Sequence, residues 1–106
     1  MAWLMLVAAG LLEIVFALAM KSSGGFVRLA PSIVTVLAGL SSVVLLSQSL
    51  RSLPVGTGYA VWTGIGAAGT AVIGMVMMGD SAAPPRLFCI VLILAGVIGL
   101  KLVSPA

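Results

Sequence analysis

The sequence predicts an all-α integral membrane protein with four transmembrane helices in each subunit. Of its 106 residues, 62% are hydrophobic and only 7% are charged, whereas soluble domains carry about 25% charged residues. The mean hydropathy is +1.37. The apolar residues form four long stretches, each sufficient to cross about 30 Å of hydrocarbon as a helix. We therefore expect one transmembrane domain, residues 1–106.

The first predicted span covers residues 2–20 and the second covers residues 29–50. The third covers residues 55–78, and the fourth covers residues 85–103, where the apolar run begins at Leu87. No basic segment precedes the first span and no small-residue cleavage site follows it, so we expect a retained helix rather than a signal peptide.

The segments between the spans are too short to hold a water-facing domain. No Walker or dinucleotide-binding glycine motif is present, so we expect transport driven by an ion gradient, with no enzyme activity, cofactor or metal. The single cysteine, Cys89, lies in the fourth span and is interpreted as a small apolar residue. The basic residues flank the spans, which indicates contact with membrane lipid and not with nucleic acid.

Positively charged groups are balanced between the two membrane faces. Three of them, Lys21, Arg28 and Arg86, fall on the face with the first and third loops, and Arg51, Lys101 and the terminal amine fall on the other. Orientation follows the Lys and Arg excess in short loops. A chain without an excess can insert both ways, which predicts an antiparallel, dual-topology homodimer. The alternative is that one loop fixes a single orientation.

Glu13 is one of two acidic residues and lies within the first span. A carboxylate near the membrane centre costs roughly 2.5–3.5 kcal/mol on insertion scales and indicates an ion or proton pathway. Gly10 and Phe16 lie one turn away on the same helix face. Gly10 favours either close helix packing or space for a substrate. A cation and protons would compete for this carboxylate, which is the minimum that an antiporter requires.

The third span carries an aromatic pair and a cluster of glycines. Tyr59 and Trp62 are three residues apart and share a helix face, where their π faces suit the flank of a cation. They lie inside the span rather than at its end, which favours a site over an interfacial anchor. Gly64 and Gly66 permit a helix kink, although close packing alone would also explain them.

The second and fourth spans supply fewer candidates. Ser41 and Ser42 lie in the middle of the second span, and the pattern alone does not separate them. In the fourth span, Ala95, Gly96 and Gly99 form a small-residue stripe suited to helix association. We predict that this stripe packs in the dimer.

Four motifs resemble one known family across the whole chain. They are Ala9-Gly10-x-x-Glu13, the loop from Gly25 to Ser32, the run from Leu53 to Gly66, and the ending from Gly96 to Lys101. These motifs closely resemble the small multidrug resistance transporters. Within this family, the chain is similar to the guanidinium-exporter subtype rather than to the quaternary-ammonium subtype. The residues that carry this similarity are Gly10, Lys101 and the motif Trp62-Thr-Gly-Ile-Gly66.

The resemblance implies an antiparallel dimer in a prokaryotic plasma membrane that exports guanidinium ion in exchange for protons. It assigns Glu13 of both subunits as the shared proton and substrate site. It implies that Ser42 and Trp62 orient Glu13 by hydrogen bonds and that Tyr59 acts as a nearby gate. The kink at the third-span glycines would accommodate two inequivalent subunit conformations.

Two positions depart from the subtype pattern. Phe16 stands where the guanidinium exporters usually have Trp, and Asp80 stands in the third loop in place of a Glu. Phe16 removes an N–H donor from the site, and an apolar ring rejects analogues less well than a hydrogen-bonding one. A polyspecific exporter of lipophilic quaternary ammonium cations is therefore the alternative function. Two further hypotheses stay open, namely a membrane subunit that transports nothing itself and a heterodimer with a paralogue.

Overall fold

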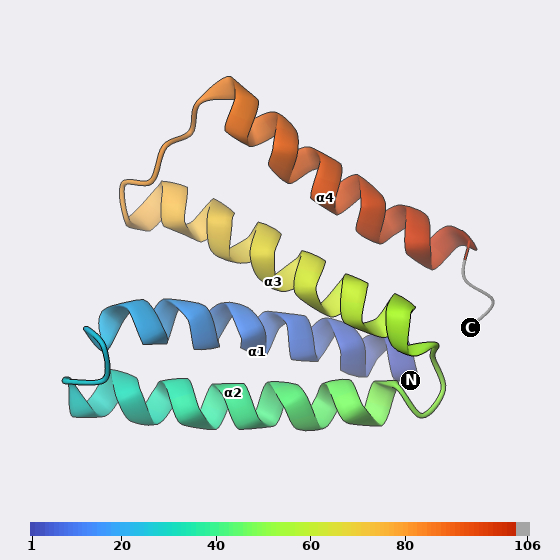
Figure 1. The fold of residues 1–106 in the computed structure, drawn as a ribbon, viewed down its shortest axis with the longest axis horizontal. Coiled ribbons are helices and arrows are strands. Elements are labelled where there is room, and N and C mark those ends of the chain that lie inside the picture. Colours follow the sequence, from blue (N-terminus) through green and yellow to red (C-terminus); the bar gives the residue numbers. More distant parts are fainter. Residues whose placement is uncertain (104–106) are drawn as a thin grey trace.

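The computed structural model describes residues 1–103 as four helices joined by short loops, with no strand in that range. The helices are α1 (Ala2–Ser22), α2 (Leu29–Ser49), α3 (Val55–Met77) and α4 (Pro84–Val103) (Figure 1). The predicted all-α, four-helix class is confirmed. Residues 104–106, which the predicted 1–106 domain includes, lie outside the described residues.

All four helices have the length and composition of membrane spans. They contain 20 to 23 residues, with mean hydropathies of 1.6 to 2.4. Many of their large apolar side chains point outward, as Leu37 and Leu102 do at 61% and 79% exposure. An outward apolar surface of this kind suits a lipid solvent, and the chain is a multi-pass membrane protein.

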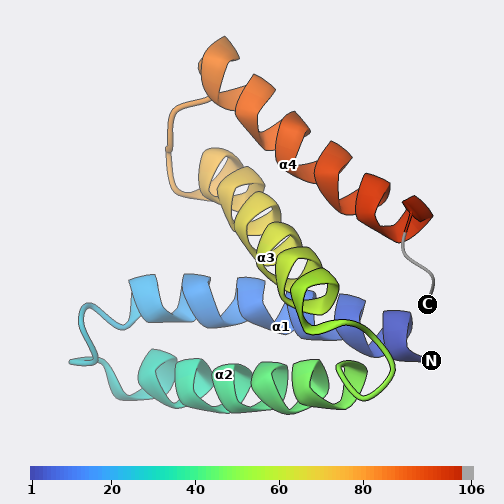
Figure 2. The ribbon, with the colours of Figure 1, turned by 45° about the vertical axis from the view of Figure 1, so that its right-hand side comes forward.

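Helix α1 is the central helix of the subunit. It packs against α2 along its length and against α3 where the two helices cross, whereas the α4 backbone packs only against α3. Figures 1 and 2 show α1 and α2 side by side and α4 on the outer side of α3. The core lies where α1, α2 and α3 meet, and its buried residues include Leu6, Ala9, Leu46 and Val61.

Glycines allow α3 to approach its neighbours closely. A Cβ at Gly10 of α1 would stand 2.6 Å from Cγ2 of Ile65, and one at Gly64 would stand 2.5 Å from Cγ2 of Val97 on α4. Both contacts need a residue without a side chain, as is common where membrane helices associate. Helix α3 runs without interruption from Val55 to Met77, and the kink at Gly64 and Gly66 stays a prediction for the transport cycle.

The loop between α1 and α2 has an unusual backbone. Gly24, Gly25 and Phe26 have consecutive positive φ angles of 61°, 80° and 68°. A non-glycine residue in this region is strained and is held there by its surroundings. The buried Ser23 hydroxyl braces the loop, since it donates to the Met20 carbonyl at 2.7 Å and accepts from the Phe26 amide at 3.0 Å. The loop thereby directs the Phe26 ring back toward the helices.

Candidate functional site

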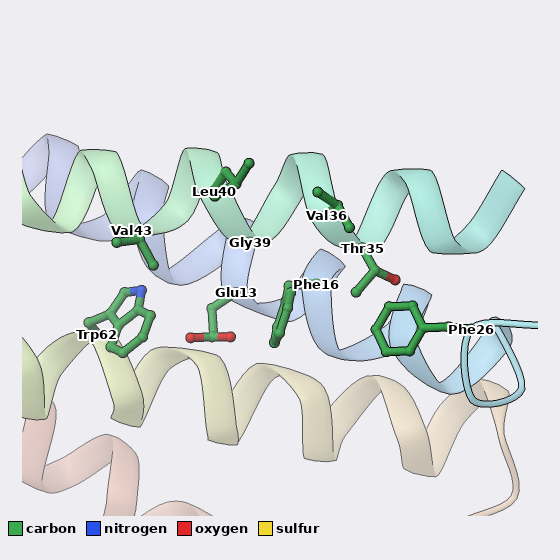
Figure 3. Close-up of a pocket in the computed structure, with 9 residues that line it drawn as sticks. All are labelled: Glu13, Phe16, Phe26, Thr35, Val36, Gly39, Leu40, Val43 and Trp62. Carbon is green, nitrogen blue, oxygen red and sulfur yellow. The ribbon is translucent and has the colours of Figure 1, made fainter. Parts of the chain in front are cut away.

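Glu13 lies halfway along α1, partly buried, where α1, α2 and α3 converge. Figure 3 shows its carboxylate between the rings of Trp62 and Phe16. Two cavities meet at this side chain. The first, here called the apolar cavity, has a volume of about 340 Å³ and lies mainly between α1 and α2. Its walls include Phe16, Phe26, Thr35, Gly39, Val43 and Trp62.

The second cavity, here called the hydroxyl cavity, has a volume of about 400 Å³ and lies between α1 and α3. Its walls include Tyr59, Trp62, Thr63, Gly66 and Thr70. Thr63 and Thr70 are seven residues apart and share one face of α3. Thr70 also lines a further crevice that reaches Lys21 and Asp80 at the membrane face. Thr70 thus lies between Glu13 and this crevice at the membrane face, whereas Thr63 lies on the other side of Gly66 along α3.

The backbone of α3 lies directly against Glu13. A Cβ at Gly66 would stand 2.5 Å from Cγ of Glu13. Any larger residue at this position would have to move the acidic side chain. Gly66 therefore sets how far the carboxylate extends between the two cavities.

A hydrogen-bond chain joins three helices one turn from Glu13. Trp62 Nε1 donates to Ser42 Oγ at 2.9 Å, and Ser42 Oγ donates to the Ala9 carbonyl at 2.7 Å. The α-helical pattern assigns that same carbonyl to the amide of Glu13, four residues later. Ser42 is buried while Ser41 is exposed. The structure thus separates two serines that the sequence pattern left equivalent.

The hydrogen bonds of Ser42 and Trp62 differ from those that the family resemblance implies, in which both residues bond to Glu13. The Trp62 indole N–H donates to Ser42, and the Ser42 hydroxyl donates to the Ala9 carbonyl. Within residues 1–103, the Glu13 carboxylate takes part in no hydrogen bond or salt bridge. Direct hydrogen bonds from Ser42 and Trp62 to Glu13 stay a prediction for the assembled dimer.

Tyr59 and Trp62 come together as their spacing predicts. Their ring centroids are 5.4 Å apart, with the planes tilted by 56°. Tyr59 is 55% exposed and lines the hydroxyl cavity next to Glu13. Two π faces and a carboxylate therefore border one cavity, an arrangement that suits a small cation.

Phe16 closes one side of the apolar cavity. The Cδ1–Cε1 edge of its ring lies against Gly39 of α2, where a Cβ would stand 2.8 Å from Cδ1 of Phe16. Phe26 lines the same cavity from the loop, next to Thr35, whose hydroxyl donates to the Pro31 carbonyl at 2.7 Å. Phe26, Thr35 and Gly39 were not predicted from the sequence to line the site. The seven-residue spacing of Thr35 and Ser42 was the available signal for a shared face.

The predicted dimer stripe on α4 faces away from the rest of the subunit. Ala95 and Gly96 are exposed, and a Cβ at Gly96 or Gly99 would meet nothing within 4 Å. These small residues do not serve packing within the chain. Among the described residues, no group of three or more His, Cys, Asp or Glu side chains could hold a metal ion.

Four membrane-spanning helices, three of which meet at one intramembrane carboxylate, define a small multi-pass transporter. The family model for the Small Multidrug Resistance protein matches residues 1–93 of the chain. The chain belongs to this family and is a transporter rather than an enzyme.

Curated relatives are similar to the chain over nearly its full length. A "Guanidinium exporter" of Yersinia pestis is 58% identical over 104 residues, which is 98% of this chain and all of the relative. The "Guanidinium exporter" of Escherichia coli (strain K12) is 56% identical and that of Salmonella typhimurium 55%, each over 96% of this chain and 97% of the relative. Because these relatives are bacterial exporters and the chain has four membrane-spanning helices, the chain is a multi-pass protein of a prokaryotic plasma membrane.

Proposed function

We propose that the protein is a proton-coupled antiporter that exports guanidinium and related small guanidinyl cations across the plasma membrane. The observation that carries this proposal is the position of Glu13. It is the only acidic residue within the four helices, and its side chain borders both the apolar and the hydroxyl cavities. The names of the relatives, "Guanidinium exporter", support the choice of cation.

The surroundings of Glu13 match the chemistry of a guanidinium ion. The ion is planar and carries N–H donors around its edge, so a carboxylate can accept two of them in parallel. The π faces of Tyr59 and Trp62 border the same space and favour a cation over a neutral molecule. One carboxylate cannot hold a proton and a cation together, so each would displace the other.

We propose further that the working unit is an antiparallel homodimer with two Glu13 side chains. The outward stripe of Ala95, Gly96 and Gly99 supports a partner contact on α4. The two faces carry equal numbers of positive groups, three on each when the terminal amine is counted, which supports insertion in both orientations. The second copy would supply the wall that each cavity lacks.

Solid-supported membrane electrophysiology on proteoliposomes tests this function. A step in guanidinium concentration should evoke a transient current in the wild-type protein, and Glu13→Gln should abolish it because the neutral amide binds neither proton nor cation. Asp80→Asn is the matched control, since Asp80 is the other acidic residue and lies in the loop before α4. A current that survives Glu13→Gln, or no current in the wild type, would refute the proposal.

The apolar cavity supports a second candidate, the export of lipophilic quaternary ammonium cations. Phe16, Phe26 and Val43 offer a surface that suits alkyl chains rather than N–H donors. Tetrapropylammonium in the same assay separates the two functions. A larger response to tetrapropylammonium than to guanidinium would favour the second candidate.

A further inference from the structure

A third cavity lies far from Glu13, at the membrane face where α1 begins and α4 ends. It has a volume of about 320 Å³, and we call it the terminal cavity. Its walls include Trp3, Val7, Val61, Ile65, Ile98 and Lys101. It shares none of these residues with the two cavities that border Glu13.

The terminal cavity has a charged mouth and an apolar interior. Lys101 Nζ lies 4.6 Å from the centroid of the Trp3 ring, in the last turn of α4. Lys and Trp side chains near helix ends settle at the level of lipid headgroups. Val7 lies one turn deeper than Trp3, and Ile65 lies well inside α3. The cavity therefore extends from headgroup level into the hydrocarbon layer, which is the path of a lipid acyl chain.

The charges at this face favour an anionic headgroup. Lys101 and Arg51 both belong to it, whereas Glu13 lies at mid-span and Asp80 lies in a loop at the opposite face. The N-terminus of α1 has no side-chain cap, so its free amide groups add partial positive charge next to Trp3. A phosphate at the mouth would meet positive groups and no carboxylate side chain.

A partner on the α4 stripe would leave the terminal cavity open to lipid. Lys101 follows Gly96 by five residues, which places it about 140° around the helix at 100° per residue. The mouth and the dimer stripe thus lie on different sides of α4. An antiparallel pair would carry one such cavity in each leaflet.

We propose that the terminal cavity binds one anionic phospholipid, with its phosphate at Lys101 and an acyl chain along Val7, Val61 and Ile65. The lipid is recognised by the combination of a negative headgroup and a hydrocarbon chain. A zwitterionic lipid lacks the net charge, and free phosphate lacks the chain. This site does not depend on which cation the protein transports.

Native mass spectrometry of the purified full-length protein tests the site. Phosphatidylglycerol and phosphatidylcholine with identical acyl chains are added separately, and the lipid adducts are counted. We expect phosphatidylglycerol to bind more tightly, and Lys101→Gln to weaken it about fivefold, the factor for one basic residue at a membrane surface. Arg51→Gln is the control, because it removes the same charge at the same face but does not line the cavity.

A second variant tests the cavity rather than the charge. Ile98 is 61% exposed and lines the cavity, so Ile98→Trp should fill it and reduce phosphatidylglycerol adducts while Lys101 is retained. Val91→Trp is the control, since Val91 is 59% exposed on α4 and lies outside the cavity. Equal binding of the two lipids, unchanged preference in Lys101→Gln, or displacement of lipid by millimolar inorganic phosphate would each overturn the proposal.

Discussion

Gly66 of α3 lies directly against the side chain of Glu13. A Cβ at Gly66 would stand 2.5 Å from Glu13 Cγ and 3.1 Å from Glu13 Cβ, and contacts below 3.0 Å do not occur without movement of one partner. Both atoms are near the base of the acidic side chain, so the carboxylate cannot avoid the clash by rotating its end alone. The position of the carboxylate thus depends on the absence of a side chain on another helix.

Gly66→Ala should therefore impair transport. The added methyl group displaces Glu13, and a displacement of about 1 Å at a reacting group can cost on the order of 100-fold in rate. We expect guanidinium-evoked current to fall by at least about 10-fold, within that range. Gly56→Ala is the control on the same helix, because a Cβ at Gly56 meets nothing within 4 Å. Equal currents in Gly66→Ala and Gly56→Ala would show that the contact between Gly66 and Glu13 does not control transport.

Ser42→Ala should destabilise the fold. The substitution removes the hydroxyl that links Trp62 Nε1 to the Ala9 carbonyl, and interhelical hydrogen bonds of this kind contribute about 0.6–1.7 kcal/mol in membrane proteins. Reversible unfolding in detergent micelles should show a loss in this range. The neighbouring Ser41 is exposed, so Ser41→Ala should change the free energy of unfolding by less than about 0.5 kcal/mol. Similar losses of unfolding free energy in both variants would show that the hydrogen bonds from Trp62 to Ser42 and from Ser42 to Ala9 do not stabilise the fold.

Guanidinium binding should weaken as the pH falls. Glu13 can bind a cation only in its ionised form, so each proton that binds to the carboxylate excludes the substrate. In the limit of one displaced proton, linkage predicts a change of about tenfold in apparent affinity per pH unit. Isothermal titration calorimetry in buffers at about pH 6, 7 and 8 measures how the apparent affinity changes with pH. An affinity that does not change with pH would rule out competition at one carboxylate.

The sequence predicted the features that depend on local pattern. Four long apolar runs gave the four helices, because only a helix satisfies the backbone across a bilayer. The spacing of three residues brought Tyr59 and Trp62 together, since helix geometry fixes which neighbours share a face. Glu13 stood out because a charge in an apolar span is costly.

The remaining site features depend on how the helices pack, which local pattern does not determine. Ser41 and Ser42 are neighbouring residues of the same type, so the sequence does not distinguish them. Only the packing of α1 against α2 decides which one reaches Ala9. Phe26 enters the apolar cavity because three consecutive residues adopt positive φ. The glycine pair before it signalled a turn but not the direction in which the ring points.

Gly96→Trp should disrupt the proposed dimer. A Cβ at Gly96 meets nothing within the subunit, so a large side chain there should leave the single chain folded and block only a partner that docks on the stripe. Single-molecule photobleaching in lipid vesicles should show a shift from two copies per complex to one. Leu94→Trp, at a site 41% exposed on α4 and at least about 100° around the helix from each stripe residue, should leave the dimer intact. A dimer that persists in Gly96→Trp would place the interface on another helix.

Gly39→Ala should narrow the range of accepted cations through Phe16. A Cβ at Gly39 would stand 2.8 Å from Cδ1 and 2.9 Å from Cε1 of the Phe16 ring, so the ring must move away from α2. Both residues line the apolar cavity beside Glu13, and a displaced ring would occupy part of it. One extra methyl group in an apolar pocket changes discrimination by about 10-fold or more. The response to tetrapropylammonium relative to guanidinium should fall by about that factor.

The double variant Gly39→Ala with Phe16→Ala distinguishes this mechanism from a general defect. Removal of the ring takes away the group that the new methyl displaces, so the relative response to tetrapropylammonium should return to the wild-type value or exceed it. Both measurements use solid-supported membrane electrophysiology with the two cations on the same sensor, so the amount of protein cancels in the ratio. If Gly39→Ala leaves the ratio unchanged, or if the double variant does not restore it, the Phe16 ring does not set the size limit of the site.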